Sequence, residues 1–247
     1  MTLSSARDAY AARFARQTMS ALSITLVADP YPPYQYEEGG AIKGIDADLI
    51  AFAFQAIGYD VQVGLLPWEE CLRQLDAGKA DGIFQITCTP EREERYVFSD
   101  LLRTAETAFF ARSNQAIQLS ETVDLREQLE SLTLGVLSGY SYDPAIDSLD
   151  PTTKMEVDDQ EDLLLGLKEK RFDLAVMDVG VAAFLADKLG ISGIKRVEGF
   201  AVTRKLFVAF RPACKDLVVQ FNTGLKKLNR QGALQRIAKR YGLRRSV

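Results

Sequence analysis

Two charged residues stand where apolar strands are expected to end, and each could hold the opposite charge of a small molecule. Arg92 lies in Thr-Pro-Glu-Arg-Glu-Glu-Arg, in the first turn of a helix expected after strand 81–86. A guanidinium there can bind a carboxylate bidentately, and the free N–H groups of the helix start add to the attraction. Asp178 ends the expected strand 173–178, where α/β sheets usually place a ligand crevice, and could accept from an ammonium group.

Both residues also have simpler interpretations, and the sequence alone leaves them open. Arg92 belongs to a run of charges that could pair at i,i+3 and i,i+4 on a solvated helix. Asp178 could cap the helix expected from Val181 onward. Trp68 and the tyrosines of the 31–36 segment supply aromatic surface on loops, which serves packing more often than binding.

The chain of 247 residues contains no histidine, and this absence removes several kinds of chemistry. Ser-His-Asp and Cys-His nucleophile systems, HExxH zinc sites and histidine proton shuttles all need that side chain. The net charge of −4 argues against broad electrostatic binding of nucleic acid. Neither GxxxxGK[ST] nor GxGxxG occurs, so the usual phosphate-binding loops are missing. We expect no metal site, no cofactor and no nucleophilic catalysis.

Three cysteines, Cys71, Cys88 and Cys214, form no CxxC pair. A bridge between Cys71 and Cys88 is an alternative, but we expect small buried residues rather than a disulfide. No stretch approaches 18 consecutive apolar residues, so we expect no membrane span. Residues 1–21 lack the apolar centre of a signal peptide and are expected to form a leader or a helix.

The alternation of strands and helices predicts an α/β fold with largely parallel pairing. Strands are expected at 23–28, 61–65, 81–86, 107–111, 133–137, 173–178 and 206–210. Helices are expected at 47–58 (opened by Asp46), 68–77, 160–168, 181–189, 217–228 and 233–241. The pattern restarts near residue 132. This predicts two lobes, one from 22–105 and 201–247 and one from 106–200, with no single sheet running through both.

In order and spacing, seven segments resemble the type II periplasmic solute-binding proteins of the polar amino-acid uptake family. They are ADPYPPYQY, KGIDADLIAFAFQAIGYDVQ, PWEECLRQLDAGKADGIF, ITCTPEREERYVFSD, LGVLSGYSY, KEKRFDLAVMDVGVAAFLA and LNRQGALQRIAKRYG. The resemblance covers about residues 23–243. It implies two lobes joined by a two-strand hinge, a Venus-flytrap architecture that closes on a ligand.

The resemblance also implies roles for individual residues. Arg92 would hold a ligand α-carboxylate, helped by Thr87 and by the backbone and hydroxyl of Ser141, and Asp178 would hold the α-ammonium. Arg92 and Asp178 would face each other across the cleft, both exposed when it is open, so replacing either would hardly affect folding. Further ligand contacts are implied for Asp29, Tyr31, Trp68, Phe84, Gln85 and Tyr140.

Some of these further residues depart from the family pattern. Tyr31 and Trp68 would flank the ligand side chain, as in the family, and Asp29 stands where members that bind polar or basic side chains often have an acid. Phe84 and Gln85, however, stand where small residues are common, and a tyrosine replaces a usual small hydroxyl residue at 140. The pocket is therefore expected to be smaller or shaped for an atypical ligand.

The leading functional hypothesis is a monomeric periplasmic protein that binds a small amino acid-like ligand for an ABC permease. The alternative is the ligand-sensing ectodomain of a membrane receptor such as a histidine kinase. A third hypothesis is an enzyme similar to cyclohexadienyl dehydratases, with Asp178 or Glu70 as the general acid. The intact pair of Arg92 and Asp178 favours amino-acid capture over that chemistry.

Overall fold

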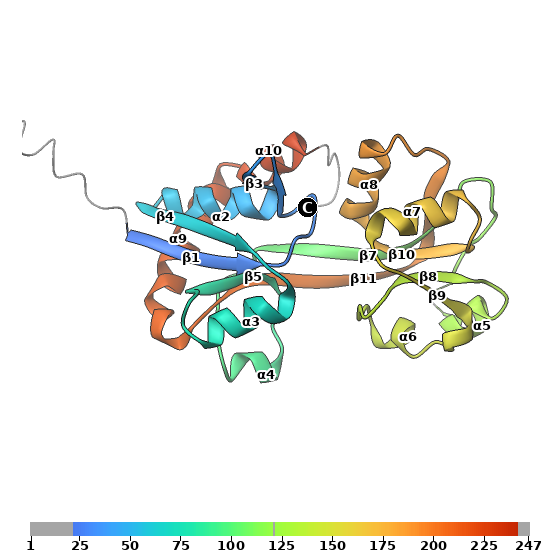
Figure 1. The fold of residues 1–247 in the computed structure, drawn as a ribbon, viewed down its shortest axis with the longest axis horizontal. Coiled ribbons are helices and arrows are strands. Elements are labelled where there is room, and N and C mark those ends of the chain that lie inside the picture. Colours follow the sequence, from blue (N-terminus) through green and yellow to red (C-terminus); the bar gives the residue numbers. More distant parts are fainter. Residues whose placement is uncertain (1–21, 121, 242–247) are drawn as a thin grey trace, which may run out of the picture.

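The computed structural model describes residues 22–120 and 122–241, so the leader or helix expected at 1–21 lies outside the described residues. Figure 1 shows two lobes joined by two long strands, β7 (Arg103–Arg112) and β11 (Ile194–Phe210). No helix in the described part of the chain is both long enough and apolar enough to cross a membrane. The mixed α/β class predicted from the sequence is confirmed.

The first lobe combines elements from both ends of the described chain. Its strands are β1 (Leu22–Ala28), β2 (Tyr36–Glu38), β3 (Ala41–Lys43), β4 (Tyr59–Leu65), β5 (Gly82–Ile86) and β6 (Val97–Phe98). Its helices are α2 (Ile45–Gln55), α3 (Trp68–Asp76), α4 (Pro90–Glu93), α9 (Lys215–Arg230) and α10 (Ala233–Arg240), with a 3₁₀ turn η2 (Pro212–Cys214). α9 and α10 return to pack against α2, so the chain crosses between the lobes twice.

The second lobe is built from one continuous stretch of chain. Its strands are β8 (Leu134–Leu137), β9 (Lys154–Val157) and β10 (Leu174–Asp178). Its helices are α5 (Leu125–Leu129), α6 (Pro144–Asp147), α7 (Gln160–Lys168) and α8 (Val179–Lys188), with a 3₁₀ turn η1 (Pro151–Thr153). Asp159 caps α7 by accepting from the backbone N–H of Asp162, and the observed bounds of α7 equal the predicted ones.

Strand pairing within each lobe is parallel except between β2 and β3, which are antiparallel, and pairing at the connection is antiparallel. β1 pairs in parallel with β4 and β5, and β8 pairs in parallel with β9 and β10. β11 is antiparallel to β5 and β7, and β7 is antiparallel to β10. The strand order is nevertheless continuous, β4-β1-β5-β11-β7-β10-β8-β9, so the expectation that no sheet runs through both lobes is wrong. The reason is the length of β11, which pairs with β7 up to Leu206 and with β5 from Phe207.

The start of α2 also differs from the prediction. The helix begins at Ile45 after Gly44, and Asp46 does not cap it. The Asp46 side chain is instead fully buried and accepts from Nε of Arg103 at 2.7 and 2.9 Å. A carboxylate near a helix start predicts a cap, because the sequence does not show its buried partner, which comes 57 residues later.

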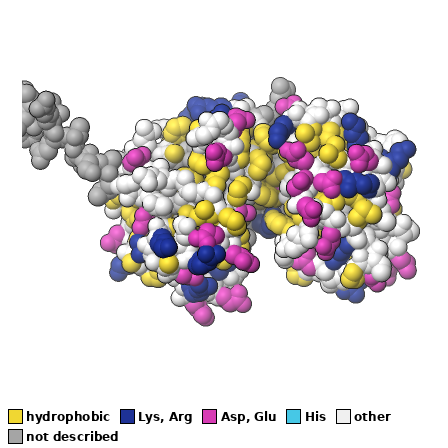
Figure 2. Space-filling model, viewed as in Figure 1, with side chains coloured by type: hydrophobic (Ala, Val, Ile, Leu, Met, Phe, Trp, Pro, Cys, Tyr) yellow, Lys and Arg dark blue, Asp and Glu magenta, His cyan; other side chains and the backbone are white. Residues whose placement is uncertain are grey.

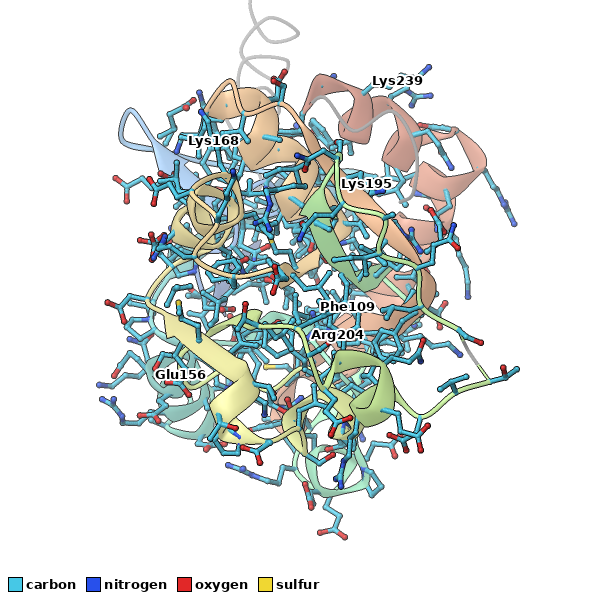
Figure 3. All side chains as sticks on the ribbon, turned by 90° about the vertical axis from the view of Figure 1, so that its right-hand side faces the viewer. Phe109, Glu156, Lys168, Lys195, Arg204 and Lys239 are labelled. Atoms are coloured by element: carbon cyan, nitrogen blue, oxygen red, sulfur yellow. The ribbon has the colours of Figure 1, made fainter. Side chains whose placement is uncertain are left out.

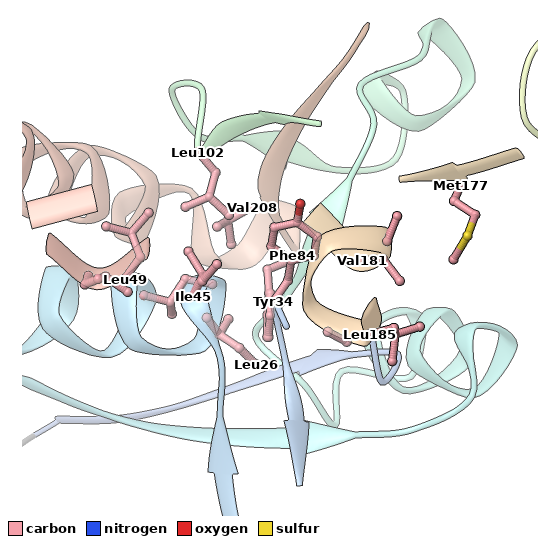
Figure 4. Close-up of a cluster of buried hydrophobic side chains, with 14 of the residues drawn as sticks. Leu26, Tyr34, Ile45, Leu49, Phe84, Leu102, Met177, Val181, Leu185 and Val208 are labelled. Atoms are coloured by element: carbon pink, nitrogen blue, oxygen red, sulfur yellow. The ribbon is translucent and has the colours of Figure 1, made fainter. Parts of the chain in front are cut away.

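One hydrophobic core extends from the first lobe into the second. Tyr34, which is 3% exposed, packs in the same cluster as Ile45 of α2 and as Val181 and Leu185 of α8. Figure 4 shows the Tyr34 ring between these two sets of side chains. The lobes are therefore in apolar contact at this point in addition to the strands that join them.

None of the three cysteines forms a disulfide bond. Cys71 is buried on α3, while Cys88 and Cys214 are partly buried, and all three are free thiols. Burial raises the pKa of the Cys71 thiol to about 11. The expected small buried residue is thus confirmed for Cys71, and the alternative bridge to Cys88 is not present.

Candidate ligand-binding site

A cavity of about 550 Å³ lies between the lobes. Figure 2 shows the two masses of the molecule with an indentation between them. The volume is in the range of small-molecule sites. The cavity is lined by Asp29, Tyr31, Trp68, Gln85, Thr87, Arg92, Ala105, Gly139, Tyr140, Ser141, Tyr142, Asp178, Arg204 and Leu206. The structure therefore brings together all of the predicted site residues except Phe84.

The prediction for Phe84 is wrong. Its side chain is 0% exposed and belongs to the hydrophobic core, near Leu26 and Val208. Successive side chains of a strand point to opposite faces, so Gln85 faces the cavity when Phe84 faces the core. Gln85 adopts a left-handed backbone with φ of 60°, which is uncommon for a residue with a side chain, and its Oε1 is buried without a hydrogen-bond partner among the described residues.

The neighbours of Arg92 orient its side chain, and no described residue forms an ion pair with it. Thr89 caps α4 by accepting from the Arg92 backbone N–H, and Pro90 occupies the first helical position. Nη1 of Arg92 donates to the carbonyl oxygen of Thr87 at 3.0 Å and to its hydroxyl oxygen at 2.6 Å. The guanidinium carbon also lies 5.4 Å from the centroid of the Trp68 ring. Burial lowers the pKa of Arg92, but a guanidinium stays protonated at neutral pH.

Asp178 uses one carboxylate oxygen within the protein and leaves the other open. Oδ1 accepts from the backbone N–H groups of Gly180 and Val181 at 2.9 and 3.0 Å, and from the Tyr34 hydroxyl at 2.8 Å. Oδ2 is buried and has no hydrogen-bond partner in the described structure. The helix-cap interpretation is thus correct for Oδ1. Asp178 is expected to be exposed when the cleft is open; in this structure its side chain is 1% exposed, where α8 approaches Tyr34.

A buried chain of polar side chains fixes the position of Tyr34. The Arg103 guanidinium carbon lies 3.5 Å from the centroid of the Tyr34 ring, and Arg103 is itself paired with Asp46. Burial, together with the charge of Asp178, raises the pKa of Tyr34 well above its usual range. The hydroxyl therefore remains protonated and donates to Asp178, which links α2, β7 and α8 to the cavity.

Two other predicted residues already have partners. The Ser141 hydroxyl donates to Oδ2 of Asp147 at 2.7 Å. The Tyr140 hydroxyl accepts from Nη1 of Arg204 at 2.9 Å. Tyr31 stacks on Tyr34 with ring centroids 6.1 Å apart and forms an aromatic wall of the cavity.

Sequence reasoning missed Arg204, together with Ala105, Tyr142 and Leu206. Figure 3 shows Arg204 near the middle of the molecule, whereas Lys239 lies at its edge. The predicted strand 206–210 began too late, because β11 carries polar residues at its exposed positions. The alternation of side chains along a strand could have identified these residues. Arg204 and Leu206 face the cavity, while Lys205 between them is exposed.

Two further expectations concern catalysis and metals. Glu70, the alternative general acid, pairs with Arg73, accepts from Gln74 and does not line the cavity. Within residues 22–120 and 122–241, no group of three or more Cys, Asp or Glu side chains is arranged to hold a metal ion.

The comparisons with known proteins place the chain among binding proteins. The Arginine-binding extracellular protein ArtP of Bacillus subtilis is 26% identical over 216 residues, covering 85% of this chain and 82% of that protein. The L-cystine-binding protein TcyJ of Escherichia coli K12 is 21% identical, covering 85% of this chain and 79% of that protein. A histidine kinase sensor domain with similarity to periplasmic binding proteins matches the fold at a TM-score of 0.70 and 18% identity, over 90% of this chain and 96% of that one. Residues 24–244 match the profile of the bacterial extracellular solute-binding proteins, family 3, and the chain therefore belongs to that family.

Proposed function

We propose that this protein binds the α-amino acid end of a small ligand in the cavity between its lobes. Arg92 binds the carboxylate through its guanidinium, and Asp178 binds the ammonium through Oδ2. The observation that carries the proposal is this buried carboxylate oxygen without a partner, on the same cavity as an arginine that is in no ion pair with a described residue. A buried charge without a counter-ion is costly, so a zwitterion that supplies both counter-ions is strongly favoured.

The surrounding residues support the same arrangement. Thr87 accepts from Arg92 through its oxygen and can donate its own hydroxyl proton to the carboxylate. Tyr31 and Trp68 supply aromatic surface on the cavity wall for the rest of the ligand. Closure of the lobes removes water, which strengthens both charged contacts. Binding of this kind needs no bond to be made or broken, and we propose that the protein is not an enzyme.

Closure also requires the lobes to move as units. We propose that these units are residues 22–105 with 201–247, and residues 106–200. The boundaries fall inside β7 and β11, the two strands that join the lobes. Bending of both strands would open the cavity while the pairing within each lobe is kept.

The family supports a place outside the cytoplasm and a role in uptake. We propose that the protein acts in the periplasm as a monomer and delivers its ligand to an ABC permease. The similarity in fold to a histidine kinase sensor domain favours sensing as the alternative output of the same binding event. Permease genes beside the gene for this chain would support uptake. A transmembrane segment and a kinase domain encoded in the same gene would support sensing.

A thermal-shift screen of the twenty amino acids tests the binding proposal. A ligand at 100 times its Kd stabilises the folded protein by about 2.7 kcal/mol, which is a readable shift. Arg92→Gln should abolish the shift, while Arg95→Gln, a change in the same segment at an exposed residue, should leave it intact. Equal shifts for both variants would contradict the role of Arg92. Turnover of prephenate by the purified protein would contradict the absence of catalysis.

A further inference from the structure

Four charged side chains line the cavity, two of each sign. Arg92 and Arg204 are the cations, and Asp29 and Asp178 are the anions. None of the four is in an ion pair with any residue of the described ranges 22–120 and 122–241. Away from the cavity the protein pairs its buried charges, as Arg103 and Asp46 show with side chains 1% and 0% exposed. The cavity thus holds two more charges than a single amino acid end can balance.

Arg204 is placed to bind an anion. It comes from β11, where the lobes join, and all its partners are neutral: Nη1 donates to the Tyr140 hydroxyl at 2.9 Å, and Nη2 approaches the Thr107 hydroxyl at 3.4 Å. Nε is buried and donates to no described group. An arginine fork held by neutral hydroxyls, with a buried donor still open, is suited to a carboxylate.

Asp29 offers the matching negative charge in the first lobe. It follows β1 directly, lines the cavity and is partly buried. A ligand with one amino acid end would engage Arg92 and Asp178 and would leave Arg204 and Asp29 without an ion-pair partner in a closed cleft. Such a complex would be disfavoured by the cost of keeping isolated charges away from water.

We propose that the ligand is a diamino dicarboxylic acid, whose second carboxylate is bound by Arg204 and whose second ammonium is bound by Asp29. This inference rests on the proposed function, since it takes Arg92 and Asp178 as the site of the first end. Two zwitterionic ends joined by a short chain carry two charges of each sign, which is the complement of the four side chains. The cavity of about 550 Å³ is large enough for such a molecule.

Isothermal titration calorimetry with four probes tests the inference: meso-diaminopimelate, L-cystine, L-arginine and L-glutamine. We expect one of the first two to bind most tightly. Arg204→Gln should weaken binding of that probe by about 30-fold or more and should weaken binding of L-glutamine by a clearly smaller factor. Asp29→Asn should have the same selective effect. Lys205→Gln, the neighbouring residue on the outer face of β11, is the matched control and should change neither.

The outcomes separate this inference from the proposed function. The proposal of a diamino dicarboxylic acid would be overturned if L-arginine or L-glutamine bound most tightly. It would also be overturned if Arg204→Gln lost affinity equally for all four probes. Either result would leave the proposal of amino-acid binding in place. If Arg92→Gln bound every probe like the wild type, the proposed function would fail and this inference with it. Arg204→Lys keeps the positive charge but lacks the guanidinium fork, and it serves as a control for misfolding. Its affinity for the tightest probe should lie between those of the wild type and Arg204→Gln. Circular dichroism checks that each variant is folded.

Discussion

At the scale of the residue, the two oxygens of Asp178 have different roles. Oδ1 caps α8 and accepts a hydrogen bond from the Tyr34 hydroxyl, while Oδ2 has no hydrogen-bond partner among the described residues. Structure and binding are thus combined in one side chain. Substitutions that differ only in what remains at Oδ1 can separate the two contributions.

Asp178→Asn and Asp178→Ala are expected to behave differently in stability and alike in binding. The amide keeps an acceptor for the cap, whereas alanine removes the cap and leaves the Tyr34 hydroxyl without an acceptor, at a cost of about 1–3 kcal/mol. Both substitutions remove the negative charge. They should weaken binding of the ligand that gives the largest thermal shift with the wild type by about 30-fold or more. Urea denaturation and calorimetry measure the two effects. Binding by Asp178→Asn within threefold of wild type would exclude Oδ2 as the ammonium site.

Asp29 should make stability depend on pH. Burial raises the pKa of its carboxyl above the usual 3.8, so its contribution to stability is present below pH 3.8 and is lost as the pH rises through the folded-state pKa. At pH 7 the ionised group therefore opposes folding. We expect Asp29→Asn to raise the Tm of the ligand-free protein at pH 7, and the gain to shrink as the pH approaches 3.8. Asp187→Asn on the exposed side of α8 is the control, and a lower Tm for Asp29→Asn at pH 7 would contradict the prediction.

At the scale of the element, one buried ion pair joins α2 to the start of β7. Arg103 and Asp46 are both buried, and Nη2 of Arg103 is without a hydrogen-bond partner in the described structure. The pair also supports the Tyr34 ring through the contact of the guanidinium with its face. Loss of one partner would leave an isolated charge in the core.

Arg103→Met is therefore expected to destabilise the protein by about 3–5 kcal/mol, because the Asp46 carboxylate would stay buried without a counter-ion. The double variant Asp46→Leu/Arg103→Met should be less destabilised than Arg103→Met, because it removes both charges. Arg95→Ala, at the exposed pair with Asp76, should cost no more than about 1 kcal/mol. Urea denaturation compares the three. A double variant less stable than Arg103→Met would show that charge burial is not the main cost.

At the scale of the whole molecule, Gly180 of α8 lies close to Tyr34 of the first lobe. A Cβ there would lie 2.2 Å from the Tyr34 hydroxyl oxygen. Tyr34 has no room to yield, because it is buried and lies against Arg103. The small residue at the start of α8 thus permits the contact that holds the cavity in its present shape.

Gly180→Ala is expected to move the lobes apart without harming α8, because alanine is the better helix former. Small-angle scattering of the ligand-free variant should show a larger radius of gyration than wild type, and its ligand affinity should fall. Ala183→Val adds bulk on the exposed face of the same helix and should change neither. An unchanged radius together with unchanged affinity would mean that Tyr34 adapts to the added methyl group.

The fold class, most element positions and nine of the fourteen residues that line the cavity could be predicted from the amino-acid sequence. Apolar periodicity places α7 and β10, because burial against a sheet imposes that period locally. Arg92 and Asp178 were found because a helix start and a strand end carry local signals in residue type, whereas the role of Thr87 was implied by the family resemblance. Phe84 was misplaced, since a shift of one residue along a strand moves a side chain from the cavity to the core.

Which charges are paired depends on how the chain folds in three dimensions. Asp46 and Asp178 both stand near helix starts, yet one is neutralised by Arg103 and the other keeps an open oxygen in the cavity. Arg204 likewise belongs to the site because β11 joins the lobes and the face of the strand that carries Arg204 points into the cavity. Pairing depends on contacts between residues far apart in the chain, such as the 144 positions between Tyr34 and Asp178, and no local pattern encodes such a contact.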